Sequence, residues 1–346
     1  MYIINLNLSG KADILIFIPI VKTEELMNTK FNTFSYAETD LEKLPKRPER
    51  SNKGTFGRLL VIGGSYGMCG AAYLCGKAAY RSGVGLTEIY TCESNRTILQ
   101  TLLPEAVLSL YNENCNLRAD MSLMRNTAKS GVDFNAGTLY SALERADAVV
   151  IGVGLGQSEI AKTVLSVVLQ TANAPIVIDA DALNIMSKNN DLKEFIIKRS
   201  GQSSNRCGGF IMTPHPVEMS RLTGKPVSEI CDHLGEVASE VADKYGCVCV
   251  LKDHNTVVAT PGSDKLYVNM SGNSGMATGG SGDVLAGIIG ALLAQGLSLE
   301  CAAELGVYIH GLAGDKASAK LGEYSVMASD IIDMLPKVFK DAAKQS

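Results

Sequence analysis

The sequence lacks the features by which nucleic-acid-binding proteins are usually recognised. Its 346 residues contain 32 Lys and Arg against 36 Asp and Glu, a net charge of −4, with no block of basic residues and no basic stripe interleaved with aromatics. Since such proteins normally carry a basic patch, we expect no nucleic acid partner. The small acidic excess does not exclude an anionic ligand, because local geometry can outweigh the total charge.

Cysteine and histidine patterns typical of disulfide or metal frameworks are also missing. No two cysteines are spaced C-x-x-C, the nine cysteines are irregularly placed, and the four histidines lie far apart. This favours reduced thiols in a cytoplasmic protein and indicates no Cys/His metal site. Cys247 and Cys249 flank one residue of an apolar stretch, so we interpret them as core residues on one face of a strand.

The N-terminal region shows no pattern that predicts a membrane span or a signal peptide. Its only apolar run, ILIFIPIV at residues 14–21, is too short to cross a bilayer and contains a proline. KTEEL follows it, where a signal peptide would have small residues. We expect no membrane partner, and we interpret the run as a buried strand or as an interface segment of a homo-oligomer.

The texture of the chain changes near residue 51. Residues 40–54 are charged and contain prolines, which predicts a linker, so we assign residues 1–50 to an N-terminal extension and linker and residues 51–346 to one domain. From there on, short continuous apolar runs alternate with helical patterns. Such runs are typical of strands covered on both faces, and the alternation predicts an α/β fold with a mostly parallel central sheet between helices.

The expected elements can be named by their sequence. Strands are expected in GRLLVIGGS, LTEIYTC, ADAVVIGVGLG, APIVIDADALN, GGFIMTPH and GCVCVLK. Helices are expected in GAAYLCGKAAYRSG, DVLAGIIGALLAQG and LECAAELGVYIHGLAGDKASAKLG. TVVATPGSDKLYVN departs from this rhythm and predicts an antiparallel hairpin around residues 261–264.

Ligands of an open parallel sheet bind beyond the carboxyl ends of the strands, so the loops there are the candidates. The barest stretch is NSGMATGGSGDVLAG, residues 273–287, whose glycines run directly into an apolar helix. Unpaired N–H groups and the helix dipole suit a phosphate there. Asp283 would repel that phosphate but could act as a base toward the nucleophile, ionised with the help of the dipole. Alternatively, Asp283 is only the N-cap of the helix.

A second glycine-rich stretch, VVIGVGLG at residues 149–156, resembles the dinucleotide fingerprint but reads GxGxG instead of GxGxxG. With Asp179 as a ribose-binding acid on the next strand, it keeps a hydride-transferring dehydrogenase open as a rival. The glycines could equally serve the close approach of a ligand or a helix. Asp179 and Asp181 lie two apart at a strand end and are expected to point the same way, toward water or Mg²⁺, unless Asp181 caps the next helix.

Two further polar residues follow expected strands. His215 stands between two prolines, which favours either a rigid ligand-contacting tip or an ordinary surface turn. Lys252 ends its strand and either contacts phosphate or is solvated. GSYGMCGAA forms a flexible loop before a helix whose alanines would permit the close approach of a flat ligand.

Six segments, in order, resemble the NAD(P)H-hydrate dehydratases, which repair hydrated nicotinamide cofactors and belong to the ribokinase-like superfamily. They are GSYGMCGAAYLCGKAAYRSGVGL, IGVGLG, IDADALN, TPHPVEMSRLTG, LKDHNTVVA and GNSGMATGGSGDVLAG. The resemblance covers about Ser51 to the C-terminus and implies a ribokinase-like three-layer sandwich. Val217, Asp253 and Ser274 stand where the family usually has Gly, Gly and Pro; Asp tolerates positive φ, so we expect the turn after Lys252 to persist.

The resemblance also implies a reaction. The substrate would be NADH or NADPH that has added water at C6, in its S epimer; phosphorylation of the C6 hydroxyl makes it a leaving group, and elimination of phosphate restores the cofactor. The bacterial character of the chain favours ADP as phosphoryl donor, giving AMP and phosphate, over the ATP of eukaryotic members, with Mg²⁺ as the accompanying ion. Some members carry an epimerase domain; the residues before Ser51 are too few for it, so no epimerase activity is predicted.

The family pattern transfers roles to particular residues. Asp283 would be the catalytic base. The expected hydrate-binding residues are Gly70, Ala71, Gly154, His215, Asn273 and Asp283. The expected nucleotide-binding residues are Lys252, Asp253, His254, Asn255, Thr256, Gly279, Gly280, Ser281 and Gly282, and Asp181 is a possible Mg²⁺ ligand. A vitamin or sugar kinase of the same fold and a non-catalytic nucleotide-binding protein remain alternatives.

Overall fold

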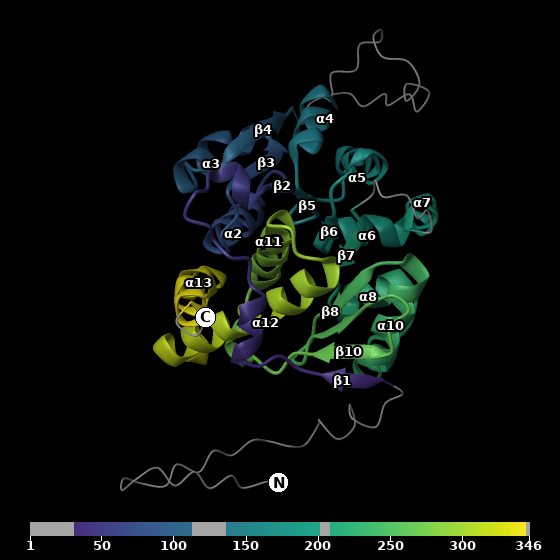
Figure 1. Cartoon of the computed structure of the whole chain (residues 1–346). Helices are drawn as coiled ribbons and strands as arrows, with labels where there is room; N and C mark the ends of the chain where they lie inside the picture. The colour runs from purple at the N-terminus through teal and green to yellow at the C-terminus, as the bar shows by residue number, and fades with distance from the viewer. Residues whose placement is uncertain (1–30, 113–135, 201–207, 344–346) are drawn as a thin grey trace, which may run out of the picture.

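A computed structural model describes residues 31–112, 136–200 and 208–343, in which ten strands form one sheet (Figure 1). The predicted segment at residues 14–21 lies outside the described residues. The sheet order is β1-β10-β9-β8-β7-β6-β5-β2-β3-β4. The strands are β1 (Asn32–Phe34), β2 (Arg58–Ile62), β3 (Leu86–Cys92), β4 (Val107–Tyr111), β5 (Ala148–Ile151), β6 (Ile176–Ile178), β7 (Phe210–Met212), β8 (Val248–Leu251), β9 (Val257–Ala259) and β10 (Lys265–Val268). Only the pairings of β9, with β8 and β10, are antiparallel, which confirms the mostly parallel sheet and the hairpin.

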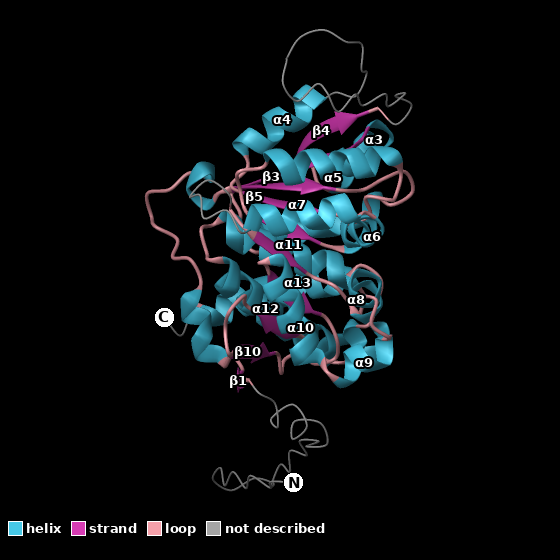
Figure 2. Cartoon of the chain, turned by 90° about the vertical axis from the view of Figure 1, so that its right-hand side faces the viewer, coloured by secondary structure: helices cyan, strands magenta, loops and turns pink. Residues whose placement is uncertain are grey.

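Helices cover both faces of this sheet, as the alternation of the strand side chains requires (Figure 2). Leu59 and Val61 of β2 enter one buried cluster, whereas Leu60 and Ile62 enter the other. The first cluster is covered by α2 (Cys69–Arg81), α3 (Arg96–Leu102), α11 (Ser281–Ala294), α12 (Leu299–Leu321) and α13 (Ala328–Ala342). The second is covered by α4 (Ala136–Arg145), α5 (Glu159–Thr171), α6 (Ala180–Lys188), α7 (Asn190–Ser200), α8 (Pro216–Thr223), α9 (Val227–Asp232) and α10 (Leu234–Tyr245). Short 3₁₀ helices are η1 (Glu38–Lys43), η2 (Lys53–Phe56), η3 (Glu93–Asn95), η5 (Ser274–Met276) and η6 (Glu323–Ser325).

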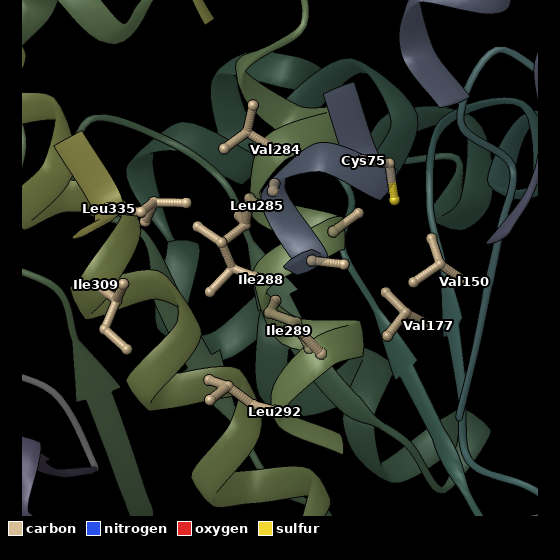
Figure 3. Close-up of a cluster of buried hydrophobic side chains, with 14 of the residues drawn as sticks. Cys75, Val150, Val177, Val284, Leu285, Ile288, Ile289, Leu292, Ile309 and Leu335 are labelled. Carbon is tan, nitrogen blue, oxygen red and sulfur yellow. The ribbon is translucent and has the colours of Figure 1, made fainter. Parts of the chain in front are cut away.

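Helix α11 lies at the centre of the first cluster (Figure 3). Its side chains face α2, α12, α13 and strands β5 and β6, so nearly every residue of the helix is buried. Two glycines make this possible. A Cβ atom on Gly287 would lie 2.2 Å from the backbone oxygen of Cys75 in α2, and one on Gly290 would lie 2.5 Å from Val150 of β5. The close packing of α2 and α11 fixes both helix starts at one edge of the sheet.

The expected boundary at residue 51 does not coincide with a break in packing. Strand β1 pairs in parallel with β10, and η1 follows it directly. Tyr36 donates a 2.5 Å hydrogen bond from its hydroxyl to Glu304 of α12, and Leu41 is buried in the first cluster. The residues from β1 through η1 therefore share the sheet and the core of the rest of the described chain.

The six expected strands and three expected helices are confirmed, but β1 and β4 were not predicted. Both are edge strands, covered less completely, so they show no continuous apolar run; Val107 of β4 is exposed. Cys247 and Cys249 lie in the second cluster as predicted, and the cysteines within the described ranges are free thiols. No helix in the described part is both long and apolar enough to span a bilayer.

Candidate active site

The candidate residues gather where β2, β5, β6, β7 and β8 end. These strands are mutually parallel, so their following loops lie at the same edge of the sheet. Helix α2 follows the loop after β2, and the start of α11 lies at the same edge because Gly282 is close to Lys252, which follows β8. Gly280 packs against Leu74 of α2, and Gly287, seven residues further along α11, packs against Cys75 and Ala78 of α2. The candidate ligand site predicted from the sequence therefore lies where these loops meet the starts of α2 and α11.

The start of α11 has glycine backbone that is exposed at Gly279 and partly buried at Gly280 and Gly282. Gly280 is the N-cap residue, with a left-handed φ of +90° and no side chain to cap the helix. Among the described residues, none accepts a hydrogen bond from the amides of Gly279, Gly280, Gly282 and Asp283. A Cβ atom on Gly279 would meet nothing within 4 Å. These N–H groups and the helix dipole make the site suitable for an anion.

Asp283 is the third residue of α11, and no capping hydrogen bond of its side chain is formed with the described residues. The alternative of a simple N-cap is therefore wrong. Burial, followed by the negative charge of Asp179, raises its pKa from 3.8 to about 7, a shift that Lys252 opposes and Asp181 reinforces. Desolvation and two neighbouring carboxylates therefore oppose the ionisation that the helix dipole was expected to favour. A carboxyl group with this pKa can exchange a proton near neutral pH.

Lys252 forms the best-defined contact of the site. Its Nζ donates to Oδ1 of Asp179 at 2.8 Å, and the hydroxyl of Thr213 donates to the same oxygen at 2.7 Å. The Asp179 side chain is 2% exposed and that of Lys252 is 20% exposed. A Cβ atom on Gly282 would lie 3.5 Å from Lys252 Nζ, so the ammonium group lies against the start of α11. Lys252 is therefore paired, and the alternative of a solvated lysine is wrong.

Asp181 turns away from Asp179. Its Oδ2 accepts a 2.8 Å hydrogen bond from the amide of Gly156, and its Oδ1 accepts a 3.3 Å bond from Gln157. The expectation that the two carboxylates point the same way is wrong, because β6 ends at Ile178 and strand alternation no longer applies. Asp181 does not cap α6 either, since that helix has Asp179 as its N-cap residue.

The donor set does not fit a protein-only Mg²⁺ site. No three His, Cys, Asp or Glu side chains in the described ranges are grouped to hold a metal. Asp179 is paired with Lys252, and Asp181 is bonded to Gly156 and Gln157. Mg²⁺ carried by a nucleotide needs only one or two carboxylates beside the phosphates, so a shared ion is compatible with this edge, whereas a resident one is not.

Three residues expected around the hydrate are brought together. Gly70 and Ala71 form the first turn of α2, and a Cβ atom on Gly154 would lie 2.8 Å from the Cβ atom of Ala71. Gly154 adopts a φ of +56°. No described atom lies within 4 Å of where a Cβ atom on Gly70 would stand, so this turn is open on its outer side. The loop glycines after β5 thus serve the close approach of α2, as one reading of the sequence proposed.

His215 is the N-cap residue of α8. Its Nδ1 accepts hydrogen bonds from the amides of Val217 at 3.1 Å and Glu218 at 3.4 Å, while the amide of His215 donates to Glu218 at 3.0 Å. Burial and then the positive charge of Lys252 lower the pKa of His215, although its side chain is 45% exposed. Val217 is an ordinary helical residue, so its replacement of the usual glycine leaves this backbone intact.

The turn expected to contact the nucleotide connects β8 to β9. Oδ1 of Asp253 accepts from the amide of His254 at 2.7 Å, Thr256 donates to the Asp253 carbonyl at 3.2 Å, and Asn255 contacts Met270. Asp253 does not use a positive φ, since Ala180 is the only non-glycine residue in the described ranges that does. The turn therefore persists for a different reason from the one expected.

Two expected contact residues are engaged elsewhere. Asn273 donates to Asp315 at 2.9 Å and accepts from the hydroxyl of Ser318 at 2.5 Å, which ties its loop to α12. Ser281 is buried, and its hydroxyl lies 3.3 Å from Nε2 of His310. Both side chains hold the glycine-rich segment against α12.

Thr213 was not singled out by the sequence interpretation, and Asp179 entered it as a ribose-binding acid or, with Asp181, as a residue facing water or Mg²⁺, but not as the partner of Lys252. Thr213 directly follows β7, so its place after a buried strand in TPH was the available signal. The partner of Asp179 lies 73 residues further on, and no spacing rule connects them.

Comparisons with known proteins identify the family of this chain. A model of the NAD(P)H-hydrate dehydratase family matches residues 59–337. The chain is 33% identical over 342 residues to the bifunctional NAD(P)H-hydrate repair enzyme of Moorella thermoacetica, covering 98% of this chain and 59% of that protein. It is also 33% identical over 314 residues to the ADP-dependent (S)-NAD(P)H-hydrate dehydratase of Bacillus subtilis, covering 91% and 99% of the two chains. The chain thus spans little more than half of the Moorella protein.

Solved structures point the same way. A ribokinase-like superfamily protein of Enterococcus faecalis aligns with a TM-score of 0.73 at 29% identity, covering 90% of this chain and 96% of that one. The Bacillus subtilis ADP/ATP-dependent NAD(P)H-hydrate dehydratase, co-crystallised with ATP and Mg²⁺, aligns with a TM-score of 0.72 at 31% identity, covering 91% and 99%. The predicted ribokinase-like three-layer fold is confirmed.

Proposed function

The chain belongs to the NAD(P)H-hydrate dehydratase family, and we propose on that basis that it dehydrates the S epimer of 6-hydrated NADH or NADPH with ADP as phosphoryl donor. The products are the reduced cofactor, AMP and phosphate. The protein is then a hydro-lyase that repairs damaged cofactor.

One observation supports this proposal above the others. Asp283, with a pKa of about 7, lies within three residues of the unpaired amides of Gly282 and Gly280, and Lys252 lies beside Gly282. A base, a phosphoryl cradle and a cation are the parts that phosphoryl transfer to an alcohol requires.

The first step is phosphoryl transfer. Asp283 accepts the proton of the C6 hydroxyl while the hydroxyl oxygen forms a bond to the β-phosphorus of ADP. The bond between that phosphorus and the bridging oxygen breaks, and AMP leaves with the bridging oxygen. The amides of Gly279, Gly280 and Gly282 stabilise the negative charge on the transferring group, with no reorganisation because the helix holds them in place.

The second step is elimination. The lone pair of the ring nitrogen expels the phosphorylated C6 oxygen as phosphate, which leaves a cationic ring. Transfer of a proton from C5 to water then restores the double bond of the reduced nicotinamide. Phosphorylation thus converts the C6 hydroxyl, a poor leaving group, into a phosphate ester that the ring nitrogen can expel.

Binding roles follow from the same assignment. We assign the hydrate to the open outer side of the first turn of α2, at Gly70 and Ala71, next to Gly154 of the β5 loop, with His215 at the start of α8 as a further contact. The nucleotide is assigned to the turn after β8 and to the backbone at the start of α11. This turn comprises Lys252, Asp253, His254, Asn255 and Thr256. A nucleotide-bound Mg²⁺ would meet the carboxylate edge formed by Asp181 and Asp283.

The direct test mixes purified protein with hydrated NADH and either ADP or ATP. Ultraviolet absorption of the reduced ring reports turnover, and AMP and phosphate are quantified separately. Regenerated NADH with ADP supports the proposal. A stable phosphorylated product without regenerated NADH would instead identify a small-molecule kinase, and turnover with ATP alone would identify an ATP-dependent dehydratase.

The cellular location and the oligomeric state are two further parts of the proposal. We propose that the protein acts in the cytoplasm, where reduced cofactors are used, and as a homo-oligomer. Light scattering on the purified chain tests the second expectation, and a single-chain mass would contradict it.

A further inference from the structure

Three neighbouring strands are each followed by one member of a cluster centred on a single carboxylate. Asp179 follows the last residue of β6, Thr213 follows that of β7, and Lys252 follows that of β8. Their backbones continue the sheet, since the amide of Thr213 donates to Ile178 at 3.1 Å and that of Lys252 to Pro214 at 2.8 Å. The sheet therefore fixes the positions from which the three side chains start.

The side chains converge on one oxygen atom. Oδ1 of Asp179 accepts from Lys252 Nζ at 2.8 Å and from Thr213 at 2.7 Å, and Asp179 is almost fully buried. Ala180, the next residue, has a left-handed φ of +46°, an unfavourable conformation for alanine. Because of that turn, the side chains of Asp179 and Asp181 point in different directions. Asp181 bonds to Gly156, and Asp179 bonds to the ammonium group of Lys252.

The held ammonium group lies at the anion cradle. Lys252 Nζ is 3.5 Å from where a Cβ atom on Gly282 would stand, and the amide of Gly282 is one of the unpaired donors at the start of α11. A lysine has four rotatable bonds and would lose this position readily if its end were not held. The pair thus places a point charge beside backbone donors that cannot move.

We propose that Asp179 is a positioning residue, whose buried carboxylate, oriented by Thr213, holds Lys252 against Gly282 so that the ammonium group contacts the nucleotide phosphates. This inference rests on the proposed function, because it assigns the ligand of the cradle as a nucleoside diphosphate. Asp179 contacts neither the nucleotide nor the hydrate in this arrangement; it acts through Lys252.

A double-mutant cycle tests the proposal with ADP as the probe. Asp179→Ala, Asp179→Asn, Lys252→Met and the double variant Asp179→Ala/Lys252→Met are compared by calorimetric titration of ADP. Loss of one charge-assisted contact to phosphate weakens ADP binding by about 10- to 100-fold in Lys252→Met. Asp179→Ala is expected to approach that loss, and the double variant is expected to equal Lys252→Met alone, because the two residues act as one unit.

The conservative variant provides a rescue. Asn at position 179 keeps an oxygen that can accept from Lys252 and Thr213, so Asp179→Asn is expected to bind ADP more tightly than Asp179→Ala. In turnover assays the same variants are expected to raise the KM for ADP more than that for the hydrate. A purely structural role of Asp179 would affect both KM values alike.

Glu88 offers a matched control. It is also a buried carboxylate with a cationic and a hydroxyl partner, Arg145 at 2.9 Å and Ser109 at 2.7 Å, but it lies on β3 away from the cradle. Glu88→Gln is expected to lower the Tm and leave the Kd for ADP unchanged.

Each result decides between the two propositions. Fold-losses in ADP affinity that multiply in the double variant would overturn the positioning role, and so would unchanged affinity in a folded Asp179→Asn protein and in Asp179→Ala. If wild-type protein binds ADP with a non-additive cycle but does not regenerate NADH, the proposed function fails while the positioning role stands. If wild-type protein does not bind ADP, both fail.

Discussion

Two buried carboxylates of this protein have nearly the same local chemistry and very different surroundings. Asp179 is paired with Lys252 and Thr213, and Glu88 is paired with Arg145 and a serine. The side chains of Asp179 and Glu88 are 2% and 1% exposed. Arg145 ends α4 shortly before β5 begins, so the Glu88 pair lies toward the edge where the strands start. The Asp179 pair lies at the opposite edge, where they end.

The difference shows that the function of a buried ion pair depends on what surrounds its cation. Lys252, the cation of the Asp179 pair, lies against Gly282 and unpaired helix amides. Arg145, the cation of the Glu88 pair, is 45% exposed to solvent at the edge where the strands start. Both pairs connect neighbouring elements, but only the first adds charge to a site with further donors. Parallel strands collect their carboxyl ends at one edge, and that edge also receives the starts of α2 and α11.

The largest effect is expected for Asp283, at the edge where the strands end, and it should change catalysis but not nucleotide binding. Asp283→Asn removes the base and is expected to lower kcat about 10²- to 10⁴-fold, while the Kd for ADP changes little. Turnover of hydrated NADH and calorimetric titration with ADP measure the two quantities. Glu88→Gln is the matched variant at the other edge, with expected wild-type kcat. Wild-type turnover by Asp283→Asn would remove Asp283 as the base.

A smaller effect is expected for the backbone next to Lys252. Gly282→Ala places a methyl group 3.5 Å from Lys252 Nζ, in the space assigned to phosphate. We expect ADP affinity to fall about tenfold, whereas the Tm stays level or rises, because alanine favours a helix by up to about 1 kcal/mol over glycine. A variant with lower Tm and normal ADP affinity would contradict this assignment.

The Glu88 pair should respond in stability only. Arg145→Met leaves a buried carboxylate without its closest cation, although Arg58 lies 4.0 Å from it and compensates in part. We expect the free energy of unfolding to fall by about 1–3 kcal/mol with unchanged kcat and KM. Chemical denaturation and turnover assays measure both, and a changed KM for ADP would show that the two edges are coupled.

The smallest expected effect is a shift in pH dependence. Because Asp283 must be ionised to accept a proton and its pKa is about 7, activity is expected to rise with pH through that value. Asp179 raises this pKa, so Asp179→Asn should move the rising limb to lower pH, by less than about one unit if Lys252 also moves. Glu88→Gln should leave the limb in place, and a limb that Asp179→Asn does not move would contradict the coupling.

Stability should follow the opposite sign. The folded-state pKa of Asp283 lies above its usual 3.8, so the folded protein binds this proton more tightly and loses stability as pH rises from about 4 to 7. Asp283→Asn is therefore expected to be more stable than wild type at pH 8, by about 1–3 kcal/mol, and equal to it below pH 4. Thermal melts at both pH values measure this, and a destabilised variant at pH 8 would contradict the buried charge.

Much of the site could be predicted because its signals are local. Glycines before α11, the strand ends at β6 and β8, and the hairpin after β8 are each readable in fewer than twenty residues. The departures at Asp253 and Val217 proved compatible with the structure for reasons that only the backbone angles reveal. Edge strands β1 and β4 escaped prediction because half-covered strands lack a continuous apolar run.

The sequence by itself determined which loops could meet at one edge and which residues there can carry a base or accept an anion, since strand alternation and glycine placement are written in neighbouring residues. Only the tertiary structure decided that Lys252 pairs with Asp179, that Asn273 and Ser281 bond to residues of α12, and that Asp283 has a pKa of about 7 instead of about 4. The physical reason is that ion pairing and desolvation depend on distances between residues far apart in the chain, which only packing sets.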